Sequence, residues 1–308
     1  MSGSSTTARV YLRLPATSAN LGPGFDTLAL ALKLHLEIEA EAADSFRIEA
    51  TGRNAEVCAA IQDNLLVKTY SELQARAGRR AVPLRVRMTN GIPLGMGCGS
   101  SAAVRLAAVA LASHFGQLAW DDERILAEAC RLEGHPDNAA ACWLGGFVAS
   151  AGSGERVQAV SLVPPKEWRA VLAMPEIPLA TTASRAVLPA AWPRRDVVEN
   201  LQRVALMTAA MATGRGELLA NAMRDRLHQP YRAEVCPLMG RLLPLAGQGG
   251  ILGVALSGAG PAVLLLADSE VAAREARERV EHAAAEAEPV EVLVCELESQ
   301  PVRVQPMG

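Results

Sequence analysis

Apolar residues alternate with small or polar residues along the segment from Thr27 to Glu39. Its even positions carry Leu28, Leu30, Leu32, Leu34, Leu36 and Ile38. A period of two places every second side chain on one face, so this segment is predicted to form a long, half-buried strand. Residues 84–89 show the same alternation and then reach Asn90-Gly91, a typical turn sequence, so a second strand is predicted to end there.

Two segments after this second strand have the composition of helices. Residues 100–114 are rich in Ala and Leu and contain no Gly or Pro, and Asp121-Asp122 supplies the acidic first turn of a run to about Glu133. Short strands are predicted near 146–151 and 157–163, before the break at Pro164-Pro165. We therefore predict an N-terminal domain over residues 1–165 and a C-terminal domain over residues 166–308.

The second half mixes predicted strands and helices without a regular strand-helix-strand order. Strands are expected near 169–174, 251–256, 262–267 and 290–297, and helices near 196–211, 235–246 and 269–286. Antiparallel alternation in the first half also disagrees with a doubly wound parallel sheet. The pattern therefore favours the α+β class for both halves.

Composition narrows the class of function. The chain has 308 residues, of which half are hydrophobic, and its 30 Lys and Arg nearly balance 33 Asp and Glu. A net charge of -3 with 4% aromatic residues argues against nucleic-acid binding and against attraction to a membrane surface. The six cysteines form no C-x-x-C pair, and no secretory signal or membrane span is evident, so we expect a cytoplasmic small-molecule enzyme.

A glycine-rich segment separates the strand at 84–89 from the helix at 100–114. It places Gly95, Gly97 and Gly99 before Ser100 and Ser101 at the start of the helix. Unpaired amides and the positive end of the helix dipole favour phosphate there, although a plain turn with a helix cap explains the same residues equally well. The segment lacks the Lys of a Walker A loop, and its glycine spacing fits the dinucleotide fingerprint badly.

Three further segments are richer in polar residues, Gly and Pro than ordinary turns. They are Pro15–Asp26 (PATSANLGPGFD), Glu133–Asn138 (EGHPDN) and Leu256–Pro261 (LSGAGP). The first is expected to link two strands, the second to form a loop at the end of a helix, and the third to bring backbone close to another group.

Together these segments resemble the three motifs of the GHMP kinases, with the glycine-rich motif at Pro93–Ala103. Within that family, PATSANLGPGFD, EGHPDN, TTASRAVLP at 181–189 and HQPYR at 228–232 are similar to the members that phosphorylate L-homoserine. Cys98 and Ser184 depart from the usual Leu and Ala. The resemblance implies a ribosomal-protein domain-2-like N-terminal domain, a ferredoxin-like C-terminal domain, ATP and Mg²⁺ as cofactors, and a homodimer. It also implies conversion of L-homoserine to O-phospho-L-homoserine on the route to threonine.

The resemblance also assigns roles to individual residues. The expected metal ligands are Ser101 and Glu133, with Glu128 as the alternative to Glu133. The residues expected to contact ATP are Asn64, Pro93, Leu94, Gly95, Met96, Gly97, Cys98, Gly99, Ser100, Ser101, Ala102 and Ala103. The residues expected on the substrate side are Asn20, Asp26, His135, Asp137, Asn138, Arg185 and Arg232, of which Asn20, Asp137 and Asn138 are the candidates for the chemistry.

Asn138 stands where several relatives have an Asp that acts as a base, and an amide side chain is a poor proton acceptor. Phosphoryl transfer needs positioning and charge stabilisation more than a strong base. We therefore expect Asn20 and Asn138 to hold the substrate hydroxyl, which loses its proton late, and Asp137 stays open as a base.

Three other functions remain to be weighed against this interpretation. The nearest is another GHMP kinase with a mevalonate-like or sugar-like substrate, which would not need the paired Arg185 and Arg232. A non-catalytic ligand-sensing relative would lose Glu133 or the serines, and all of these are present. A dinucleotide-dependent oxidoreductase is disfavoured by the glycine spacing.

Overall fold

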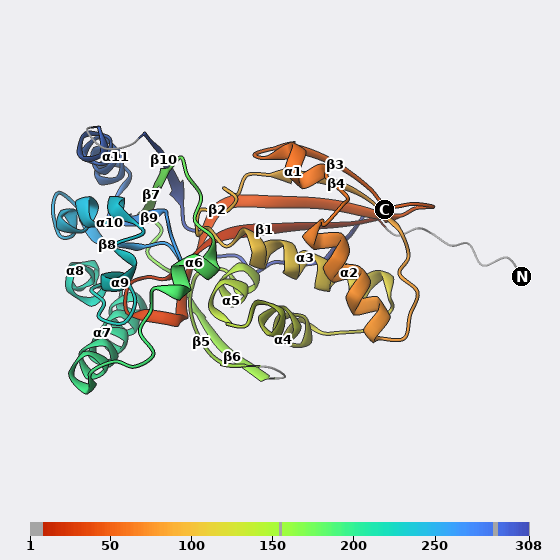
Figure 1. The fold of residues 1–308 in the computed structure, drawn as a ribbon, viewed down its shortest axis with the longest axis horizontal. Coiled ribbons are helices and arrows are strands. Elements are labelled where there is room, and N and C mark those ends of the chain that lie inside the picture. The colour runs from red at the N-terminus through yellow and green to blue at the C-terminus, as the bar shows by residue number, and fades with distance from the viewer. Residues whose placement is uncertain (1–8, 154–155, 286–288, 308) are drawn as a thin grey trace, which may run out of the picture.

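A computed structural model describes residues 9–153, 156–285 and 289–307 and contains two β-sheets (Figure 1). The first sheet has seven strands in the order β11-β1-β2-β4-β3, with β5 pairing with both β2 and β6. These strands are β1 (Arg9–Asn20), β2 (Gly24–Ala42), β3 (Arg47–Gly52), β4 (Leu84–Asn90), β5 (Phe147–Ser153), β6 (Arg156–Leu162) and β11 (Gln305–Met307). Only the β3–β4 pair is parallel among the pairs of this sheet in the described residues.

The alternating segment forms the long strand β2, as predicted. Its even-numbered apolar residues are buried or partly buried against the helices, while Lys33 on the other face is exposed. Strand β4 ends at Asn90, where the Asn90 side chain accepts a hydrogen bond from the backbone N–H of Ile92 at 3.0 Å. The turn that follows leads into the glycine-rich segment.

Four helices, α2 (Leu65–Arg76), α3 (Ser100–Phe115), α4 (Asp122–Glu133) and α5 (Asp137–Leu144), lie on one side of the first sheet, and the short α1 (Ala55–Ala59) lies near β3 (Figure 1). The predicted starts of α3 and α4 are confirmed. Asp121 caps α4 by accepting a hydrogen bond from the Arg124 amide at 2.8 Å. Alanines of α3 are fully buried, and their small size lets the helix approach the sheet closely.

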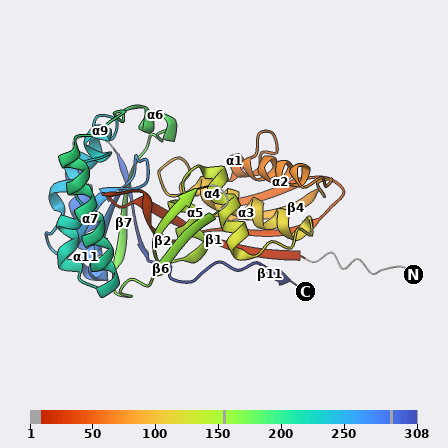
Figure 2. The same cartoon turned by 90° about the horizontal axis from the view of Figure 1, so that it is seen from below.

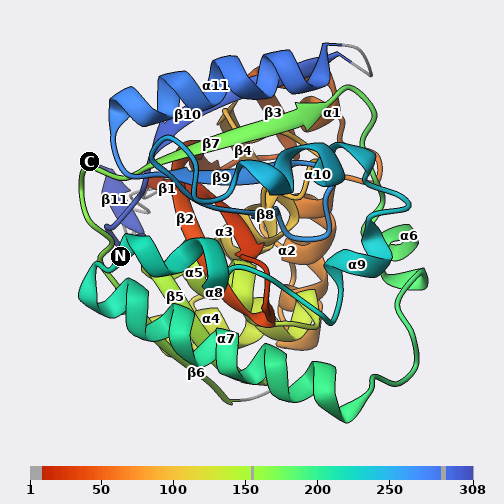
Figure 3. The same cartoon turned by 90° about the vertical axis from the view of Figure 1, so that its left-hand side faces the viewer.

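The second sheet has the order β10-β7-β9-β8, and all of its pairs are antiparallel. Its strands are β7 (Arg169–Pro175), β8 (Ile251–Leu256), β9 (Val263–Ala267) and β10 (Val290–Glu296), and its long helices are α7 (Arg194–Thr213) and α11 (Glu270–Ala284). Along the chain they follow as β7-α7-β8-β9-α11-β10, which is the ferredoxin-like arrangement that the resemblance implies. Helices α7, α10 (Pro237–Leu242) and α11, with the short α8 (Leu219–Ala222), cover the outer face of this sheet (Figure 3).

The structure corrects three of the predicted elements. The helix expected at 235–246 is divided into α10 and a 3-10 turn at Leu243–Leu245, because Pro244 cannot donate the next helical hydrogen bond. Strands continue through most of Pro15–Asp26, and only residues 21–23 form the turn. Asp137 begins α5, so the EGHPDN segment is partly helical. The last residue of the helix expected at 269–286 lies outside the described residues.

The chain passes from the first sheet to the second between β6 and β7, close to the predicted boundary at 165/166, which stays a prediction. After β10 the chain returns, and β11 pairs with Arg9–Tyr11 of β1 (Figure 2). The turn between β1 and β2 reaches among the elements of the second half (Figure 1). None of the helices in the described part of the chain is both long enough and apolar enough to cross a bilayer.

Candidate active site

The glycine-rich loop between β4 and α3 adopts a backbone that requires glycine. Gly95, Gly97 and Gly99 have φ values of 71°, 79° and 70°, which L-residues with side chains rarely adopt. A Cβ at Gly97 would overlap the carbonyl oxygen of Ser257, and one at Gly99 would overlap the hydroxyl of Thr17. These glycines therefore permit the close approach of neighbouring segments as well as the shape of the loop.

The other two motif segments hold the loop in place. Ser257 donates a hydrogen bond from its hydroxyl to the carbonyl of Gly97 at 2.8 Å, and the Thr17 amide donates to the carbonyl of Cys98 at 3.1 Å. Because Cys98 is 1% exposed and burial raises the pKa of its thiol to about 12, this side chain is a packed apolar group. Gly99 is the N-cap of α3 and no side chain caps this end of the helix, so its first amides are available to an anion.

Ser101 and Glu133 come together at the start of α3 and the end of α4. The Ser101 hydroxyl donates a hydrogen bond to Glu133 Oε1 at 2.7 Å, and Arg105 Nη1 lies 2.9 Å from the same oxygen. A hydroxyl and a carboxylate are oxygen donors of the kind that Mg²⁺ prefers. This donor set therefore fits a divalent cation beside the amides of α3.

Glu128 is engaged elsewhere. It is 3% exposed and forms ion pairs with Arg76 and Arg131, each at 2.7 Å. Burial raises the pKa of Glu128, but hydrogen bonds and charge from these two arginines outweigh burial, and the pKa falls below its usual value. The Glu128 carboxylate is therefore engaged by two arginines, whereas the Glu133 carboxylate contacts Ser101.

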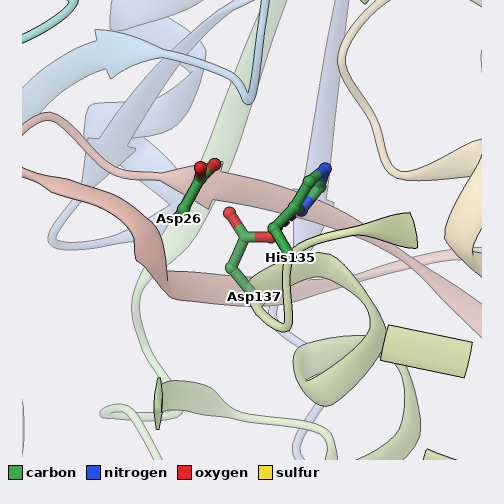
Figure 4. Close-up of side chains that lie close together, drawn as sticks. All are labelled: Asp26, His135 and Asp137. Atoms are coloured by element: carbon green, nitrogen blue, oxygen red, sulfur yellow. Dashed lines mark hydrogen bonds and ion pairs between the residues drawn. The ribbon is translucent and has the colours of Figure 1, made fainter. Parts of the chain in front are cut away.

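Asp26, His135 and Asp137, which are expected on the substrate side, form a cluster of titratable groups (Figure 4). One potential ligand atom from each residue lies within 4.8 Å of those of the other two. His135 Nδ1 is 2.6 Å from Asp137 Oδ1, which also accepts a hydrogen bond from the Asn138 amide at 2.7 Å. Burial lowers the pKa of His135, yet the hydrogen bond and charge of Asp137 outweigh it, so the pKa is raised.

Asp26 is paired with Arg185 across the two halves of the molecule. Two hydrogen bonds of 2.6 and 3.1 Å join the guanidinium to the two carboxylate oxygens. Asp26 is held in a left-handed conformation, with φ of 53°, by a hydrogen bond from its amide to Asn20 Oδ1 at 2.9 Å. Both side chains of the pair are partly exposed, and Arg185 adds a positive group next to the Asp26 carboxylate of the cluster.

The two asparagines on the substrate side make internal contacts. Asn20 Nδ2 donates to the carbonyl of Gly258 at 2.8 Å, which ties the β1–β2 turn to the LSGAGP segment. Asn138 Oδ1 accepts a hydrogen bond from the Thr17 hydroxyl at 2.7 Å. The side chain of Asn138 thereby keeps its amide donors for another partner.

Arg232, in the short helix α9 (Gln229–Arg232), is buried with 1% exposure. Its guanidinium carbon and that of Arg185, which lies in α6 (Thr181–Ala186), are each 5.4 Å from the centre of the Phe25 ring. Phe25 therefore serves as a shared platform for both cations.

Asn64 lies at the N-terminus of α2, and its side chain is used within the chain. Its oxygen accepts hydrogen bonds from the amides of Leu66 and Val67, and its nitrogen donates to the carbonyls of Cys58 and Ala60. These bonds make Asn64 the cap of α2 and the anchor of the loop before it.

The site also holds residues that were not predicted: Arg105, which pairs with Glu133, and four further residues, Thr17, Phe25, His228 and Ser257. All four lie inside the motifs that the sequence singled out. A search for hydroxyl and aromatic residues within those motifs would have found them. Their partners lie up to 207 positions away along the chain, as Arg232 does from Phe25, so the sequence alone does not reveal the contacts.

Comparison with known proteins places the chain in a family. The sequence-family model of the GHMP kinase N-terminal domain matches residues 64–146, and that of the GHMP kinase C-terminal domain matches residues 207–286. The homoserine kinase of Solibacter usitatus is 45% identical over 83% of this chain and 84% of its own length, and that of Moorella thermoacetica is 42% identical over 82% and 86%.

Solved structures agree with these sequence relatives. A structure described as a putative homoserine kinase from Listeria monocytogenes is 30% identical, with a TM-score of 0.75, and covers 97% of this chain and 100% of its own. The homoserine kinase of Cytophaga hutchinsonii has the same fold, with a TM-score of 0.82 at 24% identity over 99% and 100% of the two chains. The chain therefore belongs to the GHMP kinase family, within its homoserine kinase branch.

Proposed function

We propose that the protein transfers the γ-phosphoryl group of ATP to the hydroxyl of L-homoserine, giving O-phospho-L-homoserine on the route to threonine. The single observation that carries this proposal is the Asp26–Arg185 pair, which joins the two halves of the molecule. A free amino acid carries an ammonium and a carboxylate, so it can replace this ion pair and satisfy both partners. The names of the curated relatives agree with this substrate.

ATP would bind with its phosphates at the loop Pro93–Ala103, where the amides at the start of α3 meet their charge. Hydrogen bonds from Ser257 and Thr17 fix the loop in its conformation. Its amides therefore need little rearrangement when negative charge builds up on the phosphoryl group during transfer. Asn64 would shape the loop on the adenine side, since its own hydrogen-bonding groups are occupied.

Mg²⁺ would be held by Ser101 and Glu133, whose oxygens lie 2.7 Å apart. When bound, the ion neutralises negative charge on the phosphates. Arg105 adds a positive charge beside the same carboxylate and fixes its orientation. Glu128 takes no part in this arrangement, because Arg76 and Arg131 already neutralise it.

The substrate would place its ammonium against Asp26 and its carboxylate against Arg185 and Arg232. Charge-assisted hydrogen bonds of this kind contribute about 1.5 to 3 kcal/mol each. The His135–Asp137 pair lies next to Asp26 and would complete the polar wall around the amino acid (Figure 4).

The hydroxyl of the substrate would be held by Asn138, whose amide N–H groups remain available, with Asn20 fixing the turn beside it. Its proton would leave late and pass to the phosphoryl oxygens, because the transition state is loose and positioning carries most of the rate. Asp137 is the alternative base, although its Oδ1 already accepts two hydrogen bonds.

The test is an ATP-consumption screen with L-homoserine, L-serine, L-threonine, mevalonate and shikimate as acceptors, with and without Mg²⁺. We expect Mg²⁺-dependent turnover with L-homoserine and a phosphorylated product of the matching mass. Turnover with mevalonate or shikimate but not with homoserine would show that the substrate assignment is wrong.

A homodimer and a cytoplasmic location also remain proposals, supported by the family resemblance. Sedimentation velocity at several protein concentrations tests the first, and cell fractionation tests the second. A monomer at all concentrations would contradict the dimer.

A further inference from the structure

His228 is a buried imidazole that connects the β1–β2 turn to Arg232. Its side chain is 0% exposed. Its Nε2 lies 2.7 Å from the carbonyl oxygen of Gly22, and its Nδ1 lies 2.9 Å from Arg232 Nη1. The ring also stacks on Phe25, with centroids 5.2 Å apart and planes 24° from parallel.

The two partners determine the protonation state of this imidazole. A carbonyl oxygen only accepts hydrogen bonds, so Nε2 carries the proton that is donated to Gly22. A guanidinium only donates, so Nδ1 has no proton and accepts from Arg232. His228 is therefore neutral. Burial, which is the largest influence, lowers its pKa; the buried Asp225 carboxylate, whose Oδ2 lies 3.5 Å from Nε2, raises it, and the charge of Arg232 lowers it, so that the pKa stays below its usual value.

The contacts of Arg232 leave one edge of its guanidinium available. Nε donates to the carbonyl of Ser184 at 3.3 Å, and Nη1 donates to His228 at 2.9 Å and to the carbonyl of Gly258 at 3.2 Å. These three contacts use the Nε hydrogen and both Nη1 hydrogens, and the guanidinium has five N–H donors in total. Within residues 9–153, 156–285 and 289–307, no hydrogen bond engages the two donors on Nη2, which can therefore meet a further partner.

We propose that His228 is a positioning residue, which holds the guanidinium of Arg232 so that its Nη2 edge meets the carboxylate of the amino-acid substrate. This inference rests on the proposed function. His228 is itself held by Asp225, whose Oδ2 accepts hydrogen bonds from the amides of His228 and Gln229 at 2.9 and 2.6 Å. One buried residue thus couples the position of the β1–β2 turn, which leads into β2 and Asp26, to Arg232.

Asn200 offers a matched control on the same turn. It is buried in α7, and its Nδ2 donates to the carbonyl of Pro23 at 2.7 Å, next to the Gly22 carbonyl that His228 contacts. Both residues therefore anchor the turn from the second half, but of the two only His228 has a hydrogen bond to Arg232 among the described residues. Replacing each one separates anchoring of the turn from positioning of the arginine.

The experiment compares His228→Phe, His228→Gln and Asn200→Leu with the wild type. Phe keeps an aromatic ring against Phe25 and removes both hydrogen bonds, whereas Gln retains one donor and one acceptor. We measure KM for L-homoserine, KM for ATP, kcat and the melting temperature. We expect His228→Phe to raise KM for homoserine about tenfold, with KM for ATP within about twofold, and His228→Gln to recover part of that loss.

Asn200→Leu should lower the melting temperature as His228→Phe does, but change KM for homoserine by less than about twofold. In an Arg232→Lys background, His228→Phe should add little, because the arginine that it positions is gone. If His228→Phe does not fold, His228→Asn, whose shorter side chain cannot span both partners, replaces it in the series.

Three results would overturn the inference. They are a lower melting temperature with an unchanged KM for homoserine, an equal rise in KM for Asn200→Leu, and a full additional rise in the Arg232→Lys background. A wild type that phosphorylates another acceptor but not homoserine would instead refute the proposed function, and the inference would fall with it.

Discussion

The glycine loop and the proposed amino-acid pocket are built from different parts of the chain. Backbone amides and carbonyls make the loop, and its glycines are required by positive φ values and close neighbours. Side chains from both halves make the pocket, and they are held by buried hydrogen bonds such as that of Asn20 to Gly258. Activity should therefore fall when a methyl group is added to a glycine of the loop, and it should change little when another side chain of the loop is replaced. In the pocket, replacing a single functional group should change activity.

The largest effect is expected for Gly97→Ala, which tests the backbone side. The added Cβ would overlap the Ser257 carbonyl and require an alanine at φ of 79°, so the loop must move. Strain of about 1 to 3 kcal/mol together with a displaced phosphate site should lower kcat/KM for ATP on the order of 10³-fold. Steady-state kinetics measure this loss. Gly78→Ala is the control, because Gly78 also has a positive φ but open space around it, and activity should be retained.

Glu133→Gln is expected to lower kcat on the order of 10²-fold with the fold intact, because it removes the charge beside Ser101 while keeping size. Kinetics at saturating ATP and a range of Mg²⁺ concentrations measure it. Glu128→Gln should leave kcat nearly unchanged and reduce the free energy of unfolding by about 1 to 3 kcal/mol, since it breaks contacts with Arg76 and Arg131. The opposite ranking of the two variants in kcat would move the metal site from the C-terminal end of α4 to Glu128 within the same helix.

Arg185→Lys tests a side chain of the proposed amino-acid pocket and should change KM for homoserine but not KM for ATP. A lysine cannot reproduce the two parallel hydrogen bonds of the guanidinium, so KM for homoserine should rise about tenfold while KM for ATP stays constant. An analogue without the carboxylate should bind wild type and variant equally. Arg169→Lys, which alters an ion pair with Glu270 outside the site, is the control. A shift confined to the ATP constant would assign Arg185 to the nucleotide.

The smallest effect is expected for Cys98→Ala, within the glycine loop itself. Its thiol is buried and protonated, and the contribution of Cys98 to the loop is its carbonyl, which Thr17 contacts. We expect kcat and both KM values within about twofold of wild type and a stability loss of about 1 kcal/mol. Kinetics and calorimetry measure these values. A large loss of turnover would show that the thiol has a chemical role and that side-chain identity matters in the loop.

Elements with strong local patterns were predictable from the sequence. The alternation of β2, the Ala-rich run of α3 and the Asp121 cap of α4 specify their structures through neighbours in sequence. Pro244 also carried a local signal, since a proline inside a predicted helix usually ends it.

The contacts that build the site were much less predictable. The motifs identified Asp26, Arg185 and Glu133 as candidates. They did not indicate that Asp26 pairs with Arg185, 159 positions away, or that Glu128 pairs with Arg76, 52 positions away. Hydrogen bonds between distant segments depend on how the two halves pack, and periodicity within a segment carries no information about that. His228 and Phe25 lay within the quoted motifs, yet their buried roles depend entirely on such long-range contacts.

The return of the chain after β10 gives the two halves two covalent crossings instead of one. One runs between β6 and β7, and the other leaves β10 and leads to β11 beside β1. His35 and Glu298, 3.1 Å apart, hold the second crossing against β2. A single proteolytic cut near residues 163–166 would therefore leave two polypeptides that stay associated through the pairing of β11 with β1 and the contact of Glu298 with His35, and expression of residues 1–165 alone would leave the β1 edge without its partner strand.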